Sequence, residues 1–180
     1  IKALLEQSDK AQQIFAVQLL LNHTTPAEAL PNDLWNALLN STNAGIRTIG
    51  IQLLGQFSDE NLLKKQATLT DYSVSPLEDV RQAIRPIIGR LVKKDEAFAQ
   101  NLVEQFVRLL LRKEKYEGLH KDVSLLLSQE LKEFLHTVPR KITFRLLNSK
   151  YTPGQQVGIL LVQKYIAAST LSVRNIIRLA

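Results

Sequence analysis

The feature that most constrains the fold of this chain is its internal repetition. Residues 38–54 read LLNSTNAGIRTIGIQLL and residues 146–162 read LLNSKYTPGQQVGILLV, so both begin with LLNS and carry a Gly-Ile pair. The two segments are 108 residues apart, which divides into three units of 36. Residues 4–20 align with residues 38–54 at an offset of 34, and the same offset of 34 separates Ile46-Arg47 from Val80-Arg81. Repetition at this interval is typical of stacked helical hairpins.

Residues 75–91 show the helical signals of one unit most fully. Ser75 suits an N-cap, Pro76 suits the first helical position, and Glu78 completes a capping box. Apolar residues then recur at steps of three and four, which predicts an amphipathic helix with one packed face and one exposed polar face. The apolar positions are Val80, Ala83, Ile84, Ile87, Ile88 and Leu91, and the polar positions are Arg81, Gln82, Arg85 and Arg90.

Two of these segments resemble the second helix of HEAT repeats. Both Ile46-Arg47 to Leu54-Gly55 and Val80-Arg81 to Ile88-Gly89 pair an aliphatic residue with Arg, continue with small and aliphatic residues, and end near Leu-Gly. The resemblance covers nearly the whole chain and is strong in these two units. Gln13 and Gln155 stand at the Arg position of the first and last units, so we expect any ladder of stacked charges to be interrupted there. The resemblance implies helix pairs whose second helices line a concave binding groove, and it implies no single function.

We therefore predict an all-α fold, an α-solenoid of about five stacked HEAT-like helical hairpins in one repeat domain over residues 1–180. The expected units are 1–23, 26–57, 58–92, 95–136 and 139–168, with 171–180 starting another. Single helices are expected from residue 58 to about 69 and from about 119 to 135. Because Ile1 is neither an initiator Met nor part of a signal-like segment, we expect the chain to be part of a larger protein.

Composition and motif searches argue against several classes of protein. No apolar run approaches the roughly 20 residues that span a bilayer, and the absence of Cys fits a cytoplasmic location, which is our expectation. His23, His120 and His136 fall in separate units without metal-binding spacing, and no phosphate-binding glycine loop is present. Carboxylate pairs lie at predicted helix starts, where capping explains them. We therefore expect no metal, no cofactor and no catalytic residues.

Trp35 is the one Trp of the chain and has two interpretations. On a HEAT-like scaffold with basic residues, it is similar to the aromatics with which HEAT-like DNA glycosylases engage a damaged nucleotide. However, Trp35 lies between Leu34 and Leu38 in an apolar pattern, and no paired aromatic and acidic constellation can be placed near it. Core packing is the favoured interpretation.

The first functional hypothesis is a non-enzymatic scaffold that binds a protein partner of unknown identity, or neighbouring domains of the parent chain, through the polar face of its second helices. The same side chains are also typical of ordinary solvated helix surface. The candidate residues are Arg47, Thr48, Gln52, Arg81, Gln82, Arg85, Gln155, Gln156 and Lys164.

The second hypothesis follows from the charge distribution. The chain has a net charge of +6, yet residues 140–180 alone carry seven basic residues and no acidic ones. Such one-sided charge attracts nucleic acid or an acidic protein surface, or it is balanced by chain outside this sequence. The alternative function is therefore nucleic-acid binding, which a steep salt dependence would reveal. The predicted phosphate contacts are Arg140, Lys141, Arg145, Lys150, Arg174 and Arg178.

Overall fold

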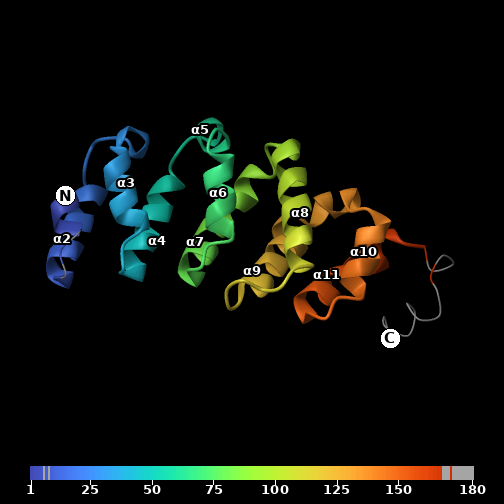
Figure 1. Cartoon of the computed structure of the whole chain (residues 1–180). Coiled ribbons are helices and arrows are strands. Elements are labelled where there is room, and N and C mark those ends of the chain that lie inside the picture. The colour runs from blue at the N-terminus through green and yellow to red at the C-terminus, as the bar shows by residue number, and fades with distance from the viewer. Residues whose placement is uncertain (6, 8, 168–170, 172–180) are drawn as a thin grey trace.

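The computed structural model describes residues 1–5, 7, 9–167 and 171, and every regular element within these residues is a helix. The prediction of an all-helical fold is thereby confirmed. Figure 1 shows the helices following one another in chain order along an elongated row, from blue at the N-terminal end to orange. No helix in this part of the chain is long and apolar enough to span a bilayer. The α-helices are α1 (Lys2–Leu5), α2 (Lys10–Leu21), α3 (Asn32–Leu39), α4 (Ala44–Leu54), α5 (Asp59–Leu63), α6 (Gln66–Ser73), α7 (Glu78–Leu91), α8 (Glu96–Leu110), α9 (Leu119–Leu125), α10 (Arg140–Leu147) and α11 (Thr152–Tyr165).

Neighbouring helices pack in pairs. Helix α3 packs on α4, α6 on α7, and α10 on α11. The pairs are joined through their second helices, because α2 contacts α4, α4 contacts α7, α7 contacts α9, and α9 contacts α11. A row of contacts through α2, α4, α7, α9 and α11 therefore runs along the described part of the chain.

The buried apolar residues form two clusters. The smaller N-terminal cluster joins α1 to α4, and its members include Ala16, Leu38 and Leu53. The larger cluster runs from α4 to α11. Trp35 packs against both clusters, and its ring meets that of Phe57 edge-on with centroids 5.4 Å apart. The predicted packing role of Trp35 is confirmed.

The predicted capping box at Ser75 is wrong. Helix α7 begins at Glu78, with Leu77 as its N-cap in extended backbone geometry. The Ser75 hydroxyl accepts a hydrogen bond from the Leu77 N–H at 3.2 Å, which forms a tight turn before the helix. The Ser75 carbonyl accepts a hydrogen bond from the Arg81 side chain. This contact keeps the turn separate from the first turn of α7.

Two helices predicted as continuous are interrupted. Residues 58–69 become α5 and α6, because the chain tightens into a turn at Lys64 and Lys65 that lets both Leu62 and Leu69 be fully buried. Residues 119–135 become α9, the π-helix η2 (Leu126–Glu130) and the 3₁₀-helix η3 (Lys132–Thr137). The wider π turn closes with the Leu131 N–H on the Leu126 carbonyl at 2.9 Å and buries both leucines. A short 3₁₀-helix η1 (Ala27–Ala29) precedes α3.

Candidate functional site

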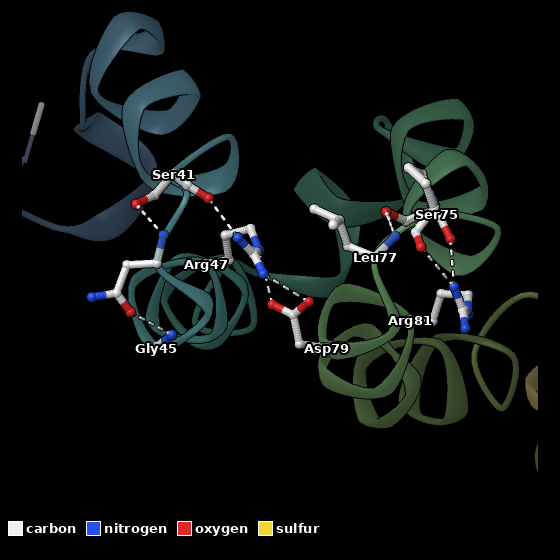
Figure 2. A network of polar contacts seen from close by, with 9 residues as sticks. Ser41, Gly45, Arg47, Ser75, Leu77, Asp79 and Arg81 are labelled. Carbon is white, nitrogen blue, oxygen red and sulfur yellow. Dashed lines mark hydrogen bonds and ion pairs between the residues drawn. The ribbon is translucent and has the colours of Figure 1, made fainter. Parts of the chain in front are cut away.

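The polar side chains at the start of the second helices form a ladder that joins successive units. Arg47 on α4 is only 8% exposed and donates from Nε and Nη2 to both carboxylate oxygens of Asp79, at 2.8 and 3.0 Å. Its Nη1 donates to the carbonyl of Ser41 at 2.6 Å. Figure 2 shows Arg47 between Ser41 of its own unit and Asp79 at the start of α7. This bidentate contact fixes α7 against α4.

Arg81 on α7 repeats this arrangement one unit later. It is 2% exposed, and its Nε donates to Asp122 of α9 at 2.6 Å. Its Nη1 donates to the carbonyl of Ser75 at 2.8 Å, and its Nη2 donates to the carbonyl of Glu117 at 3.1 Å. Figure 2 shows Arg81 below Ser75 in the same relation that Arg47 has to Ser41. Because the buried Arg81 donates to three groups of the same chain, its role is to hold these segments together.

Neutral side chains extend the ladder to the other units. Gln13 donates to the carbonyl of Gln7 at 2.7 Å, and Gln155 donates to the carbonyl of Ser149 at 2.7 Å, in each case six residues earlier, as for the two arginines. Gln13 also accepts from Asn43 of the second unit at 3.2 Å. The charged ladder is thus interrupted at Gln13, as predicted, while the chain of hydrogen bonds continues.

In the fourth unit, a shorter side chain makes the connection to the unit that follows. The Ser124 hydroxyl on α9 donates to the carbonyl of Pro153 in α11 at 3.4 Å. At this distance the contact is weaker than those of Arg47 and Arg81, and it joins α9 to α11 without a charged group.

The prediction that Arg47 and Arg81 lie on the exposed face is wrong. Helical periodicity predicts that charged residues on the polar side of a helix are solvated. A guanidinium can nevertheless be buried when it has several well-placed acceptors. A Ser followed six residues later by Arg or Gln occurs at Ser41, Ser75 and Ser149, and this spacing is the sequence signal that would have identified the ladder.

Thr48 and Gln52, also predicted to be exposed, line a groove between α4 and α7. The groove has a volume of about 410 Å³, and Gln52 is exposed within it. Sequence reasoning did not select its other polar members, Gln56 and Arg90. Arg90 is held at the edge, since it donates to the carbonyl of Gly55 at 2.9 Å and pairs with Asp59 at 2.9 Å. The remaining lining residues are Ile51, Gly55, Ala83, Pro86 and Ile87.

The other candidates do not join this groove. Arg85 is half-buried and pairs with Glu130 at 3.0 Å and with Gln129. Gln82 is exposed and donates to Glu78 at 2.8 Å. Gln156 and Lys164 are exposed on α11, in the last described unit. The predicted set therefore divides into ladder residues, groove residues and separate surface residues.

The basic residues of the last quarter are placed as predicted only in part. Arg140, Lys141 and Arg145 are exposed on α10, and Lys150 is exposed in the loop after it. The Arg140 guanidinium lies over the Phe144 ring, 5.5 Å from its centroid. Within the described residues, no ion pair involves Lys141, Arg145 or Lys150. Arg174 and Arg178 lie outside the described residues.

His120 has the most perturbed environment of the three histidines. It is 2% exposed, its ring meets Tyr151 edge-on at 5.1 Å, and its Nε2 has no hydrogen-bond partner. Burial lowers the pKa of His120, although the nearby Glu114 opposes this shift. Among the described residues, no three His, Asp or Glu side chains are grouped as metal ligands would be.

Comparisons with protein-family models, curated proteins and solved structures found no match for this chain.

Proposed function

We propose that this chain is a non-enzymatic protein-binding scaffold, an α-solenoid of HEAT-like hairpins whose second helices line a concave groove. The observation that carries the proposal is the division of polar residues on α4 and α7. Arg47 and Arg81 turn inward and hold the units in order, while Thr48 and Gln52 remain available in the groove between the same helices. On α4, the structural role of Arg47 and the proposed binding role of Thr48 and Gln52 thus fall to different side chains of one helix.

The chemistry of the groove favours an uncharged stretch of polypeptide as its ligand. Gln52 and Gln56 each offer a donor and an acceptor, which suits the main-chain amides of an extended segment. The rings and methyl groups of Pro86, Ala83 and Ile87 offer an apolar floor. Arg90 is already paired with Asp59, so it adds little attraction for an acidic ligand.

A photo-crosslinking experiment tests this proposal. A photoreactive amino acid at Gln52 should crosslink to a protein partner, and Gln52→Arg and Thr48→Arg should each weaken binding of that partner about tenfold or more, because a long cation fills the groove. The control position is Gln105, which is exposed on α8. Equal crosslinking from Gln52 and Gln105, or unchanged affinity in both Arg variants, would count against the groove.

A second candidate function is nucleic-acid binding by α10. Lys141 and Arg145 are four residues apart on one helix, and like charges at this spacing repel unless an anion lies beside them. We expect binding of a labelled duplex to fall steeply between about 50 and 200 mM salt and to be lost in a Lys141→Glu, Arg145→Glu variant. The matched control is Arg112→Glu with Lys113→Glu in the exposed connector after α8. Equal loss in both variants would show nonspecific charge attraction and reject α10 as the site.

A further inference from the structure

The outward side of α2, at the N-terminal end of the row, is apolar and uncovered. Phe15 is 54% exposed and Leu19 is 41% exposed, although large apolar residues on the other second helices are mostly buried. Ile14 and Leu21 on the same helix are 56% and 53% exposed. Phe15 and Leu19, four residues apart on one side of the helix, form the part of this exposed apolar area that faces away from α4, and exposed apolar side chains that lie together mark an interaction surface.

The repeat itself shows what covers this surface in the next unit. At the offset of 34, Phe15 corresponds to Ile49 and Leu19 corresponds to Leu53. Leu53 is 5% exposed, and both Ile49 and Leu53 pack in the cluster that contains Ala16, Val17 and Leu20 of α2. The side of α4 that matches the exposed side of α2 is therefore filled by the second helix of the preceding unit.

The polar ladder also ends at α2 with a side chain that has no partner from a preceding unit. Asp9 corresponds to Asn43, and each caps its helix by accepting from the N–H two residues later, at 2.8 and 2.9 Å. Asn43 also donates to Gln13 of the preceding unit. The carboxylates that accept from the preceding arginines in later units, Asp79 and Asp122, lie inside the first turn of α7 and α9 and not at the N-cap. Asp9 is exposed and has no ion-pair partner within the described residues.

We propose that Asp9, Phe15 and Leu19 form a docking surface for an amphipathic helix that carries an Arg near its start and small or aliphatic residues on the facing side. The Arg binds the free carboxylate oxygen of Asp9 from the position that Gln13 has beside Asn43. The aliphatic residues cover Phe15 and Leu19 on the side where Ile49 and Leu53 of α4 pack in one cluster with α2. This surface is separate from the α4–α7 groove and does not depend on it.

A symmetric pair of copies fits this surface less well. Two chains that met through the same side of α2 would offer Asp9 no guanidinium, because α2 contains no Arg. The carboxylate therefore favours a basic helix over a second copy of the same helix.

The test joins a donor helix to the whole chain. Residues 24–57, which include α3 and α4 with Arg47, are fused ahead of Ile1 through a Gly/Ser linker of about 15 residues, whose mean span is roughly 20 Å. The linker raises the effective concentration enough to reveal weak docking. Fluorescence and circular dichroism then follow urea unfolding of the fused and unfused chains.

Three substitutions in or next to α2 distinguish docking of the added helix from a general effect of changing a surface residue. Phe15→Ser, Leu19→Ser and Asp9→Asn are each made in both chains; Asn keeps the cap that Asp9 provides. We expect each to lower the urea midpoint of the fused chain clearly and that of the unfused chain little. The control is Ile14→Ser, because Ile14 is as exposed as Phe15 but corresponds to Thr48 on the groove side. It should change both chains equally.

The outcomes are decisive in either direction. Effects of Phe15, Leu19 and Asp9 substitutions that are confined to the fused chain support the docking surface. Equal effects in both chains, or an effect of Ile14→Ser as large as that of Phe15→Ser, would overturn it. Concentration-dependent dimerisation of the unfused chain that Phe15→Ser abolishes, measured by sedimentation, would assign the surface to a second copy instead.

Discussion

Among the individual side chains, Arg81 contributes most clearly to holding the units together. Arg81→Leu would leave Asp122 and the carbonyls of Ser75 and Glu117 without their donor in a buried place. We expect a loss of about 3–5 kcal/mol in the free energy of unfolding, measured by urea denaturation. Arg81→Lys should also destabilise the protein strongly, since one ammonium cannot reach all of these acceptors.

Arg108 provides the control for Arg81. It pairs with Glu104 on the exposed side of α8, and both side chains are at least 60% exposed. Arg108→Leu should cost less than about 0.5 kcal/mol. If Arg81→Leu were no more harmful than Arg108→Leu, the ladder would not be a source of stability.

His120 makes a second prediction, which concerns pH. Because burial lowers the pKa of His120, the unfolded chain takes up a proton at this residue at a higher pH than the folded chain does. The stability that depends on neutral His120 is therefore complete above the ordinary value of 6.5 and declines as pH falls below it. Urea unfolding between about pH 7.5 and 5.5 should show a flatter pH dependence for His120→Phe than for the parent chain. An unchanged slope would contradict this role.

The exposed polar residues were easier to predict than the buried ones. The helical period correctly placed Gln52, Gln82 and Gln156 at the surface. It failed for Arg47 and Arg81, because periodicity reports the direction of a side chain around its own helix and contains nothing about the acceptors that the next unit supplies. Asp79 and Asp122 lie 32 and 41 residues away in the sequence, so only the packing of the units brings them to the arginines.

The packing of α10 against α11 is close at Gly158. A Cβ atom at Gly158 would lie 2.3 Å from the N atom and 2.6 Å from the Cα atom of Leu147, and backbone atoms cannot move aside without separating the helices. Gly158→Ala should therefore cost about 1–3 kcal/mol, as overpacking does elsewhere. Thermal or urea unfolding measures this cost.

The equivalent Gly50 is the matched control. A Cβ atom there would meet side-chain atoms of Leu38 and Leu39 at 3.0–3.1 Å, and the first unit already has the buried Ala16 at this position. Ala also has a higher helix propensity than Gly by about 1 kcal/mol. Gly50→Ala should be close to neutral, and equal losses at both glycines would show that the α10–α11 contact is not specially close.

Polar residues mark the start of some helices and not of others. Asp9 caps α2 and Asp95 caps α8, whereas Ser75 does not cap α7. Prediction failed around Lys64 and from Leu126 to Leu131, where leucines are so frequent that the helical period continues through a turn. In both places, burial of leucines against neighbouring helices decides where the helix is interrupted.

Across the chain as a whole, stability should be unevenly distributed. The smaller N-terminal cluster is bounded on one side by the exposed face of α2, whereas the larger cluster is enclosed by helices from α4 to α11. Trp35 lies where the two clusters meet, so its fluorescence reports on that boundary. In urea, the Trp35 transition should precede the loss of far-UV circular dichroism by roughly 0.5 M, as expected for local opening of the less stable end. Coincident transitions would indicate one cooperative unit.

The two edges of the molecule differ in stiffness as a result of the ladder. Ion pairs such as Arg47–Asp79 and Arg81–Asp122 pin successive units along one edge. Between the first helices α3 and α6, by contrast, there is a cavity of about 350 Å³ lined by Trp35, Leu39 and Tyr72. At its rim, Glu28 accepts hydrogen bonds from Ser58 and Asn61 of the next unit, and these exposed contacts are the link on this side. We therefore expect the molecule to bend mainly on the α3–α6 side. A change in its curvature should widen or narrow the cavity between α3 and α6, while the distances between units along the ion-paired edge stay nearly constant.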